Sequence, residues 1–346
     1  MPAPSVLFLG GTGIISSACT RRALEEGFDV FVLGRGLSTT RPAPEGCRLL
    51  TGDLDDPASF RAAVGDRDFD VVADFRAFGP DDVRSRLDVL RGRMGQYVFI
   101  SSASAYQTPP ARLPVVESTP LRNPYWDYSR GKIAAEDLLV RAHREDGLPV
   151  TIVRPSHTYD HTSPPFDGGW TVVDRMRRGA EVVVHGDGTS LWTLTHHTDF
   201  ARAFVGLLGH PGAIGDSFHI TSDEWLSWNQ VYEIVAAAAG VEPRLVHVTS
   251  DAIAGVDAEW GAALLGDKAH SMVFDNAKVK GVVPGWRAAV PFQRGAAEIV
   301  DWFDADPARQ QVDARMDALM DRLVEQHRGD ASGESRATVY EGTPKP

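Results

Sequence analysis

Tyr128 and Lys132 are two side chains that could perform acid–base chemistry together. Their i, i+4 spacing places them on one face of a helix. A tyrosine with a pKa near ~10 is a poor base at neutral pH, but a neighbouring ammonium favours its phenolate form. Ser102 stands at the end of a predicted strand earlier in the chain, where its hydroxyl could stabilise a developing oxyanion. We therefore predict that Ser102, Tyr128 and Lys132 form a catalytic set.

A glycine-rich turn near the N-terminus, Gly10-Gly11-Thr12-Gly13, follows the first apolar segment and precedes a predicted helix. Glycines let the backbone approach a pyrophosphate, and a helix N-terminus offers unpaired N–H groups and a positive dipole. In this position the turn predicts a dinucleotide-binding site, against the alternative of a plain tight turn. Ser16 replaces the usual third glycine, and its small side chain is compatible with close helix–strand packing.

The residues after the next predicted strands bear on the choice of dinucleotide. Leu33-Gly34-Arg35-Gly36 carries no carboxylate that could hold the ribose hydroxyls of NAD, whereas Arg35 could receive the 2′-phosphate of NADP. This pattern favours NADP without excluding NAD. The alternative is that Arg35 is a solvated loop residue. Asp53 stands where an adenine contact would lie, or caps a turn, and Arg76 could meet a phosphate or an acidic partner.

The elements that must position these residues alternate between strand and helix. Several predicted strands are apolar throughout, so we expect both faces of the sheet to be covered. Strand–helix alternation with short connections predicts right-handed βαβ units and a parallel sheet. The expected fold is α/β, a Rossmann-type doubly wound parallel sheet with a smaller C-terminal substrate-binding domain. The predicted strands are Val6–Leu9, Asp29–Leu33, Arg48–Leu50, Asp70–Asp74, Gln96–Ser101, Val150–Arg154 and Ser217–Ile220, and the predicted helices are Ser16–Glu26, Asp56–Val64, Pro80–Arg91, Tyr128–Glu145, Thr198–Leu208, Trp228–Ala239, Ala296–Phe303 and Ala308–Gln326.

The second half of the chain is less regular and rich in tryptophan, which predicts a smaller domain that caps the sheet. We assign residues 1–157 and about 196–221 to a dinucleotide-binding domain. Residues of about 158–195 and 222–328 form the cap domain, and the polar segment 329–346 is a flexible tail.

Charge and composition exclude several classes of protein. A net charge of −12 argues against non-specific binding to nucleic acid or to an anionic membrane. No apolar run reaches the ~20 residues that span a bilayer, and the N-terminus lacks the basic and cleavage regions of a signal peptide. Cys19 and Cys47 are too few for a disulfide framework. We expect a cytoplasmic protein with inert thiols and no bound metal.

Taken in order, these motifs resemble the extended short-chain dehydrogenase/reductase family, of the NAD-dependent epimerase/dehydratase type. The Gly34-Arg35 pair and the variant phosphate turn also resemble the family's atypical, chloroplast RNA-binding-like branch. The matching pieces cover about residues 5–220: Gly10-Gly11-Thr12-Gly13, Gly52-Asp53-Leu54, Ile100-Ser101-Ser102-Ala103-Ser104-Ala105-Tyr106, Tyr128 with Lys132, Arg154-Pro155, Gly186-Asp187-Gly188 and Asp199. The resemblance implies a homodimer and a set of cofactor-binding residues, namely Gly10, Thr12, Gly13, Ile14, Ile15, Arg35, Asp53, Leu54, Phe75, Ser101, Tyr128, Lys132 and Pro155.

The resemblance also implies a reaction on a sugar-like small molecule. Tyr128 removes the proton of a substrate hydroxyl while hydride passes to the nicotinamide, and Ser102 hydrogen-bonds the developing carbonyl oxygen. Lys132 binds the nicotinamide ribose and holds the phenolate. The transient ketone is then reduced on its other face, loses water after deprotonation of a neighbouring carbon, or simply leaves. These outcomes correspond to epimerisation, dehydration and oxidation.

Two departures from the family pattern concern the substrate. Ala103 and Ser104 replace the Asp-Glu pair of the family's sugar dehydratases, so elimination would need another base, with His157, His196 and His197 as candidates. His157 and Trp192 stand where members acting on nucleotide-diphosphate sugars carry Asn and Arg. A nucleoside, a sugar phosphate or another polyol is therefore at least as compatible as a nucleotide-diphosphate sugar. The predicted substrate-binding residues are Ser104, Tyr106, His157, Trp192 and His196.

Several of these assignments have alternatives. Trp192 fits core packing as well as stacking on a substrate, and His196 or His197 fits a structural hydrogen bond. A different class of function is a non-catalytic cofactor-sensing or RNA-binding protein on the same fold. The intact Ser102, Tyr128 and Lys132 favour catalysis over this hypothesis, and the net charge of −12 opposes RNA binding.

Overall fold

The computed structural model describes residues 2–331, with side chains through Arg328. Most of the predicted tail, residues 332–346, lies outside the described residues. Its predicted start is wrong, however, because the last helix continues through Gly329 to Ala331.

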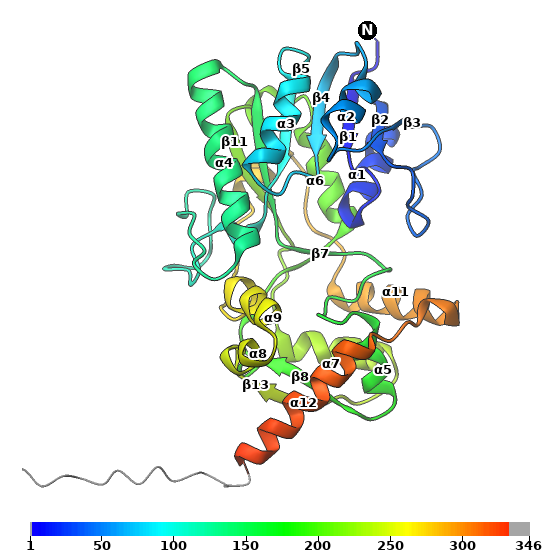
Figure 1. Ribbon diagram of the computed structural model, residues 1–346, viewed down its shortest axis with the longest axis vertical. Coiled ribbons are helices and arrows are strands. Elements are labelled where there is room, and N and C mark those ends of the chain that lie inside the picture. Colours follow the sequence, from blue (N-terminus) through cyan, green and yellow to red (C-terminus); the bar gives the residue numbers. More distant parts are fainter. Residues whose placement is uncertain (1, 332–346) are drawn as a thin grey trace, which may run out of the picture.

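The first domain is built on one sheet of seven parallel strands (Figure 1). Their order across the sheet is β11-β6-β5-β4-β1-β2-β3, and each neighbouring pair is parallel. Side chains of the central strands are buried on both faces, as the apolar segments predict. The strands are β1 (Ser5–Leu9), β2 (Asp29–Gly34), β3 (Arg48–Thr51), β4 (Phe69–Asp74), β5 (Met94–Ile100), β6 (Val150–Pro155) and β11 (Asp216–Ile220).

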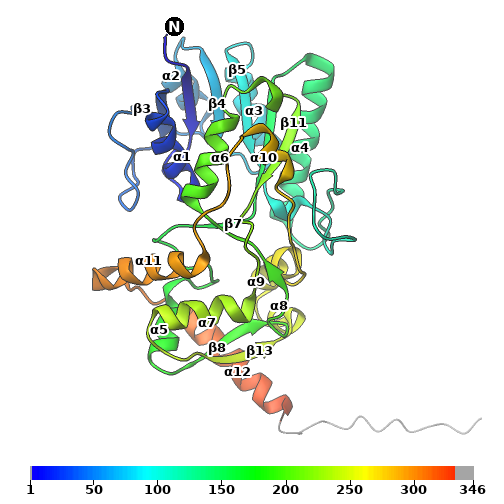
Figure 2. The ribbon, with the colours of Figure 1, turned by 180° about the vertical axis from the view of Figure 1, so that it is seen from behind.

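Helices cover both faces of this sheet, which confirms the doubly wound architecture (Figures 1 and 2). One face packs against α1 (Ile14–Glu25), α6 (His197–Leu207) and α10 (Ala277–Val282). The other packs against α2 (Pro57–Val64), α3 (Pro80–Leu90) and α4 (Asp127–Asp146). Local sequence sets the helix ends: the Asp56 carboxylate accepts a hydrogen bond from the Ala58 N–H at 2.9 Å, ahead of the first turn of α2.

The cap domain has a separate hydrophobic core, in which tryptophans and other aromatic residues pack around a parallel strand pair. That pair is β8 (Glu181–His185) and β13 (Arg244–Val248). Two further pairs, β7 (His157–Tyr159) with β10 (Leu194–His196) and β9 (Leu191–Trp192) with β12 (Leu226–Ser227), accompany the crossings between the domains. The helices are α5 (Trp170–Arg177), α7 (Trp228–Ala238), α8 (Ser250–Val256), α9 (Ala258–Ala263), α11 (Phe292–Asp304) and α12 (Ala314–Ala331), and the short turns are η1 (Ala103–Ala105), η2 (Pro211–Ala213), η3 (Leu264–Lys268) and η4 (Pro307–Arg309).

Two features of the second half differ from the sequence-based expectations. The predicted helix Ala308–Gln326 is divided, because Asp306 and Asp313 each accept hydrogen bonds from following N–H groups and so begin two separate elements, η4 and α12. The chain also returns to the first domain a second time, where Val279 of α10 and Trp286 join the core beside α6. The assignment of all of residues 222–328 to the cap domain is therefore incorrect.

No helix within residues 2–331 combines the length and apolar composition needed to cross a membrane.

Candidate active site

The glycine-rich turn forms part of the wall of a cavity of about 580 Å³ at the carboxyl ends of β1 and β2. Gly10 has φ +84°, a conformation that favours glycine, and its N–H donates to the Leu33 carbonyl at 3.1 Å. A Cβ at Gly10 would lie 2.4 Å from Cγ of Arg76. The Gly13 N–H donates to Ser16 Oγ at 2.7 Å, so Ser16 helps to close the turn. The Arg76 side chain thus packs against Gly10, and the cavity beside the turn, lined by Gly10, Gly11, Thr12 and Arg76, fits a dinucleotide.

Five of the thirteen predicted cofactor residues line this cavity. Gly10, Thr12, Arg35, Asp53 and Leu54 do so, together with Arg76, for which the sequence left two roles open. Ile14 and Ile15 begin α1 beside the turn. Phe75 is placed differently, because it packs against Phe8 and Phe204 with ring centroids 6.0 and 5.3 Å away.

A second pocket, of about 240 Å³, brings together residues from the carboxyl ends of β5 and β6 and the start of α4. Of the predicted residues, Ser102, Ser104, Tyr128, Pro155 and His157 line it. The sequence analysis missed its other lining residues, Ala103, Trp126, Ser156, Thr158 and Asp267. Trp126 and Ser156 are next to matched motifs, but Asp267 is distant in sequence and carried no signal.

Three serine hydroxyls form a chain at the base of this pocket. Ser129 Oγ donates to Ser104 Oγ at 2.7 Å, and Ser104 Oγ lies 2.8 Å from Ser102 Oγ. Since Ser104 accepts from Ser129, its own hydroxyl proton can point to Ser102. The Ser102 proton is then available for an oxygen atom in the pocket. This arrangement suits a hydroxyl that must donate to a developing carbonyl oxygen.

Tyr128 faces two opposing influences on its acidity. Burial raises the pKa of Tyr128 to about 12, although a hydrogen bond with Ser102 lowers it and the Asp267 carboxylate raises it further. The Lys132 ammonium lies 5.6 Å from the centre of the Tyr128 ring. Because a neighbouring positive charge favours a phenolate, the pairing of these two residues stays a prediction.

Lys132 is almost completely buried, with 2% of its surface exposed. Its ammonium donates to the carbonyls of Ala77 at 2.7 Å and Ile100 at 2.8 Å, which leaves one of its three N–H groups for another acceptor. Burial lowers the pKa of Lys132 to about 8, against the opposing effect of Asp74 and other acidic groups.

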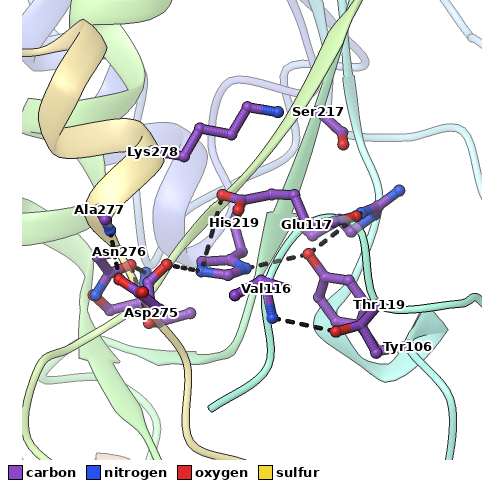
Figure 3. Close-up of polar contacts among 12 residues, drawn as sticks. Tyr106, Val116, Glu117, Thr119, Ser217, His219, Asp275, Asn276, Ala277 and Lys278 are labelled. Carbon is purple, nitrogen blue, oxygen red and sulfur yellow. Dashed lines mark hydrogen bonds and ion pairs between the residues drawn. The ribbon is translucent and has the colours of Figure 1, made fainter. Parts of the chain in front are cut away.

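Three predicted substrate-binding residues do not line the pocket of Tyr128. Tyr106 is fully buried, and its hydroxyl lies 3.1 Å from Nδ1 of His219 (Figure 3). The same hydroxyl accepts a hydrogen bond from Arg154 at 3.2 Å. Trp192 is 1% exposed and packs in the cap core, so this structure supports core packing rather than stacking on a substrate. His196 caps α6, and its Nε2 lies 3.0 Å from Glu298. Tertiary packing places each of these three side chains outside the Tyr128 pocket. The residue type alone does not predict this placement.

The cofactor cavity, the Tyr128 pocket and the parallel sheet correspond to one known family. A sequence model of the NAD dependent epimerase/dehydratase family matches residues 6–221, which is more than half of the chain. The chain belongs to this family.

Within residues 2–331 no three His, Cys, Asp or Glu side chains cluster in a way that could hold a metal ion.

Two relatives of this chain illustrate the range of named proteins to which its sequence is similar. The chain is 27% identical over 255 residues to the chloroplast stem-loop binding protein of 41 kDa b of Arabidopsis thaliana, covering 70% of this chain and 65% of that protein. It is 30% identical over 166 residues to a UDP-glucose 4-epimerase of Lactobacillus helveticus, covering 43% of this chain and 50% of the relative. Less than two thirds of each relative's length is therefore matched.

Solved structures of epimerases and dehydratases share the fold over more of the chain. Epimerase Mth375 of Methanothermobacter thermautotrophicus aligns with a TM-score of 0.73 at 16% identity, covering 89% of this chain and 94% of that one. The dTDP-glucose 4,6-dehydratase of Bacillus anthracis in complex with NAD aligns with a TM-score of 0.71 at 20% identity, covering 88% of this chain and 98% of that one. Both similarities confirm the Rossmann-type fold of the family.

The half-buried His157, which lines the pocket, predicts a loss of stability in acid. Burial lowers the pKa of His157 to about 3, with a further contribution from Lys268. Between an unfolded-state pKa of ~6.5 and this value, the unfolded chain binds a proton that the folded chain excludes, so the free energy of unfolding falls as pH falls. The expected contribution of His157 between pH ~7 and ~5 is about 2 kcal/mol.

Urea unfolding of His157→Gln measures this contribution. The variant should lose about 2 kcal/mol less stability than the wild type between pH ~7 and ~5. His327→Gln, which removes an exposed histidine of α12, serves as the control and should match the wild type. An identical pH dependence for His157→Gln and the wild type would contradict a neutral, buried imidazole.

Proposed function

We propose that this protein is an NAD(P)-dependent enzyme that oxidises a hydroxyl of a sugar-like substrate to a transient ketone, with Tyr128 as the base. The observation that carries this proposal is the shared pocket of Tyr128 and Ser102 at the carboxyl ends of parallel strands. Ligands of open parallel sheets bind at this edge. Relatives named as a UDP-glucose 4-epimerase and a dTDP-glucose 4,6-dehydratase support sugar chemistry of this kind.

The chain's own residues have distinct roles in this mechanism. A bound nicotinamide cofactor supplies the hydride acceptor. Tyr128 accepts the proton of the substrate hydroxyl, and Ser102, oriented by Ser104, donates a hydrogen bond to the oxygen as it becomes a carbonyl. Lys132 stabilises the Tyr128 phenolate electrostatically and keeps one N–H for a further acceptor.

We further propose that Arg35 gives the site a preference for NADP. Arg35 lines the cofactor cavity from the segment after β2, and no carboxylate partner of Arg35 is found among the ion pairs of residues 2–331. A guanidinium without such a partner can receive a 2′-phosphate through its planar fork. A dinucleotide with a 2′-phosphate should therefore bind more tightly than one without it.

Arg35→Glu tests this preference. We expect the variant to bind NADP⁺ about 10- to 100-fold more weakly, because a charge-assisted hydrogen bond is replaced by repulsion, while NAD⁺ affinity changes little. Isothermal titration of both dinucleotides measures the two affinities, with the exposed Arg112→Glu as a charge-matched control. Equal losses for NAD⁺ and NADP⁺ would refute the assignment of Arg35 to the 2′-phosphate.

The fate of the ketone follows from what surrounds it. Ala103 and Ser104 occupy the positions after Ser102, and Ser104 is committed to the serine chain. Neither is an acid or base suited to elimination of water. His157 and Asp267 are the other groups lining the pocket that could move a proton. Epimerisation and reversible oxidation need no further base besides Tyr128, so we propose these outcomes over elimination.

A direct assay tests the proposed function. The full chain with saturating NADP⁺ or NAD⁺ is incubated with free hexoses, hexose phosphates and nucleotide-diphosphate hexoses, and product formation is followed by cofactor absorbance and by chromatography. Interconversion or oxidation of at least one compound supports the proposal. Failure across the panel, together with absence of dinucleotide binding, would reject it.

The relative named as a chloroplast stem-loop binding protein motivates a second candidate, RNA binding. The net charge of −12 opposes it, because phosphates are repelled by an acidic surface. Filter binding of a stem-loop RNA at several salt concentrations distinguishes the two functions.

We also propose that the protein is a homodimer in the cytoplasm. Light scattering of the purified protein measures its oligomeric state.

A further inference from the structure

One acidic side chain enters the Tyr128 pocket from the cap domain. Asp267 belongs to η3, a single π-helical turn that continues directly from α9. Asp267 is the only Asp or Glu among the described residues that line the pocket.

The backbone on both sides of Asp267 is held by hydrogen bonds. Asn123 Nδ2 donates to the Gly266 carbonyl at 2.6 Å. On the other side, the Lys268 carbonyl accepts from Ser190 Oγ at 2.9 Å and lies 3.1 Å from Nε2 of His185. These contacts restrain the turn, so the carboxylate is presented to the pocket by a fixed backbone.

Gly266 brings this turn close to α4. A Cβ at Gly266 would lie 2.7 Å from Cβ of Trp126, so a larger residue would push the turn away from the start of the helix that carries Tyr128. The Asp267 carboxylate also raises the pKa of Tyr128, which lines the same pocket. The two groups therefore interact within one site.

The pocket contains no positive charge to balance this carboxylate. Of its ten described lining residues, none is Lys or Arg. Burial lowers the pKa of His157 to about 3, so its imidazole is neutral above that pH. Lys268 follows Asp267 in the chain and lowers its pKa, but the Lys268 ammonium is shared with Asp167, which lies 3.5 Å away. A phosphate in this pocket would therefore meet a carboxylate with no Lys or Arg among the lining residues beside it.

We propose that Asp267 accepts hydrogen bonds from hydroxyls of the substrate and makes the Tyr128 pocket selective for an uncharged polyol ring over a phosphate-bearing group. A carboxylate offers several acceptor sites to hydroxyl donors, and such bonds are stronger than those between neutral groups. The inference rests on the proposed function only in taking the Tyr128 pocket as the place where the substrate binds.

Binding measurements with two probes test the proposal without requiring turnover. D-galactose and D-galactose 1-phosphate are titrated, with ligand-observed NMR, into the full chain saturated with NADP⁺ at pH ~8. We expect the wild type to bind D-galactose at least tenfold more tightly than its phosphate, as expected for one or two hydrogen bonds to a charged acceptor together with repulsion of the phosphate. In Asp267→Asn this ratio should fall to about one.

The matched control is Asp251→Asn, an exposed carboxylate at the start of α8, which should retain the wild-type ratio. Burial raises the pKa of Asp267 to about 6, so the affinity of the wild type for D-galactose alone should decline between pH ~7 and ~5 as the carboxyl becomes protonated. The phosphate probe is left out of this arm because its own second pKa is about 6. This pH arm tests the proposal on the wild-type chain even if Asp267→Asn folds poorly.

The alternative results overturn the proposal. They are an unchanged ratio in folded Asp267→Asn, a wild type that binds the phosphate as tightly as the free hexose, or a wild type that binds neither probe. The two proposals can fail separately. If Tyr128→Phe leaves turnover intact while Asp267→Asn abolishes the discrimination, the proposed function is wrong and the assignment of Asp267 is supported.

Discussion

Replacing Tyr128 by phenylalanine is expected to lower kcat by about 10²- to 10⁴-fold on any substrate that the wild type oxidises or epimerises. The substitution removes one oxygen atom and leaves the ring to pack beside Trp126, whose ring centroid lies 4.7 Å away. General acid–base catalysis contributes a factor of this size. The fold should be retained, because the aromatic ring that packs against Trp126 is kept.

The pH dependence of turnover provides an independent check on this assignment. Burial raises the pKa of Tyr128 to about 12, so the phenolate is the minor form at neutral pH in the unliganded chain. The wild-type kcat/KM should therefore increase as pH rises, until the enzyme begins to unfold or the hydroxyl is fully ionised. The residual activity of Tyr128→Phe should lack this increase. A variant that retains more than about one tenth of the wild-type kcat would contradict Tyr128 as the base.

Replacing Arg154 by methionine is expected to produce the largest loss of stability, about 3–5 kcal/mol. Arg154 and Glu136 are both buried, and they are joined by two hydrogen bonds of 2.9 and 2.5 Å. The same guanidinium donates to the Tyr106 hydroxyl and to the Glu117 carbonyl, each at 3.2 Å. Methionine fills similar volume but leaves the Glu136 carboxylate buried without its partner.

Urea unfolding of single and double variants separates the ion pair from packing. Arg154→Met should lower the unfolding midpoint strongly at pH ~7 because Glu136 is then an uncompensated charge. Arg154→Met/Glu136→Leu should recover much of the loss, since removing both charges also removes the cost of burying one alone. A double variant as unstable as Arg154→Met would indicate that the contacts with Tyr106 and Glu117 carry most of the stabilisation.

The buried network around Arg154 also explains why family motifs are not all catalytic. Arg154 belongs to the family motif Arg154-Pro155, and Tyr106 ends the motif that also contains Ser102. The structure places both in one polar cluster with His219, whose Nε2 lies 2.7 Å from the Asp275 carbonyl (Figure 3). This cluster ties β6 and β11 to the segment that leads into α10, and so supports the sheet edge beside the pocket.

Local patterns in the sequence determined the sheet, its covering helices and the catalytic candidates. The apolar runs of β1 and β4, the glycine turn and the i, i+4 pairing of Tyr128 with Lys132 each depend on residues close together in the chain. Backbone sterics and helical periodicity act over this range, so residue order is enough to predict them. The order of the motifs along the chain then predicted the family, and the family match over residues 6–221 confirms it.

Tertiary packing alone decided which distant side chains share the pocket. Asp267 lies far from Tyr128 in sequence, and it reaches the pocket only because the turn at Gly266 packs against Trp126. Trp192 and His196 have the residue types expected of ligand contacts, yet the cap core and the start of α6 bury them. A side chain's surroundings are set by the summed packing of segments that meet only in the folded chain, whereas its type and spacing are properties of the chain before it folds.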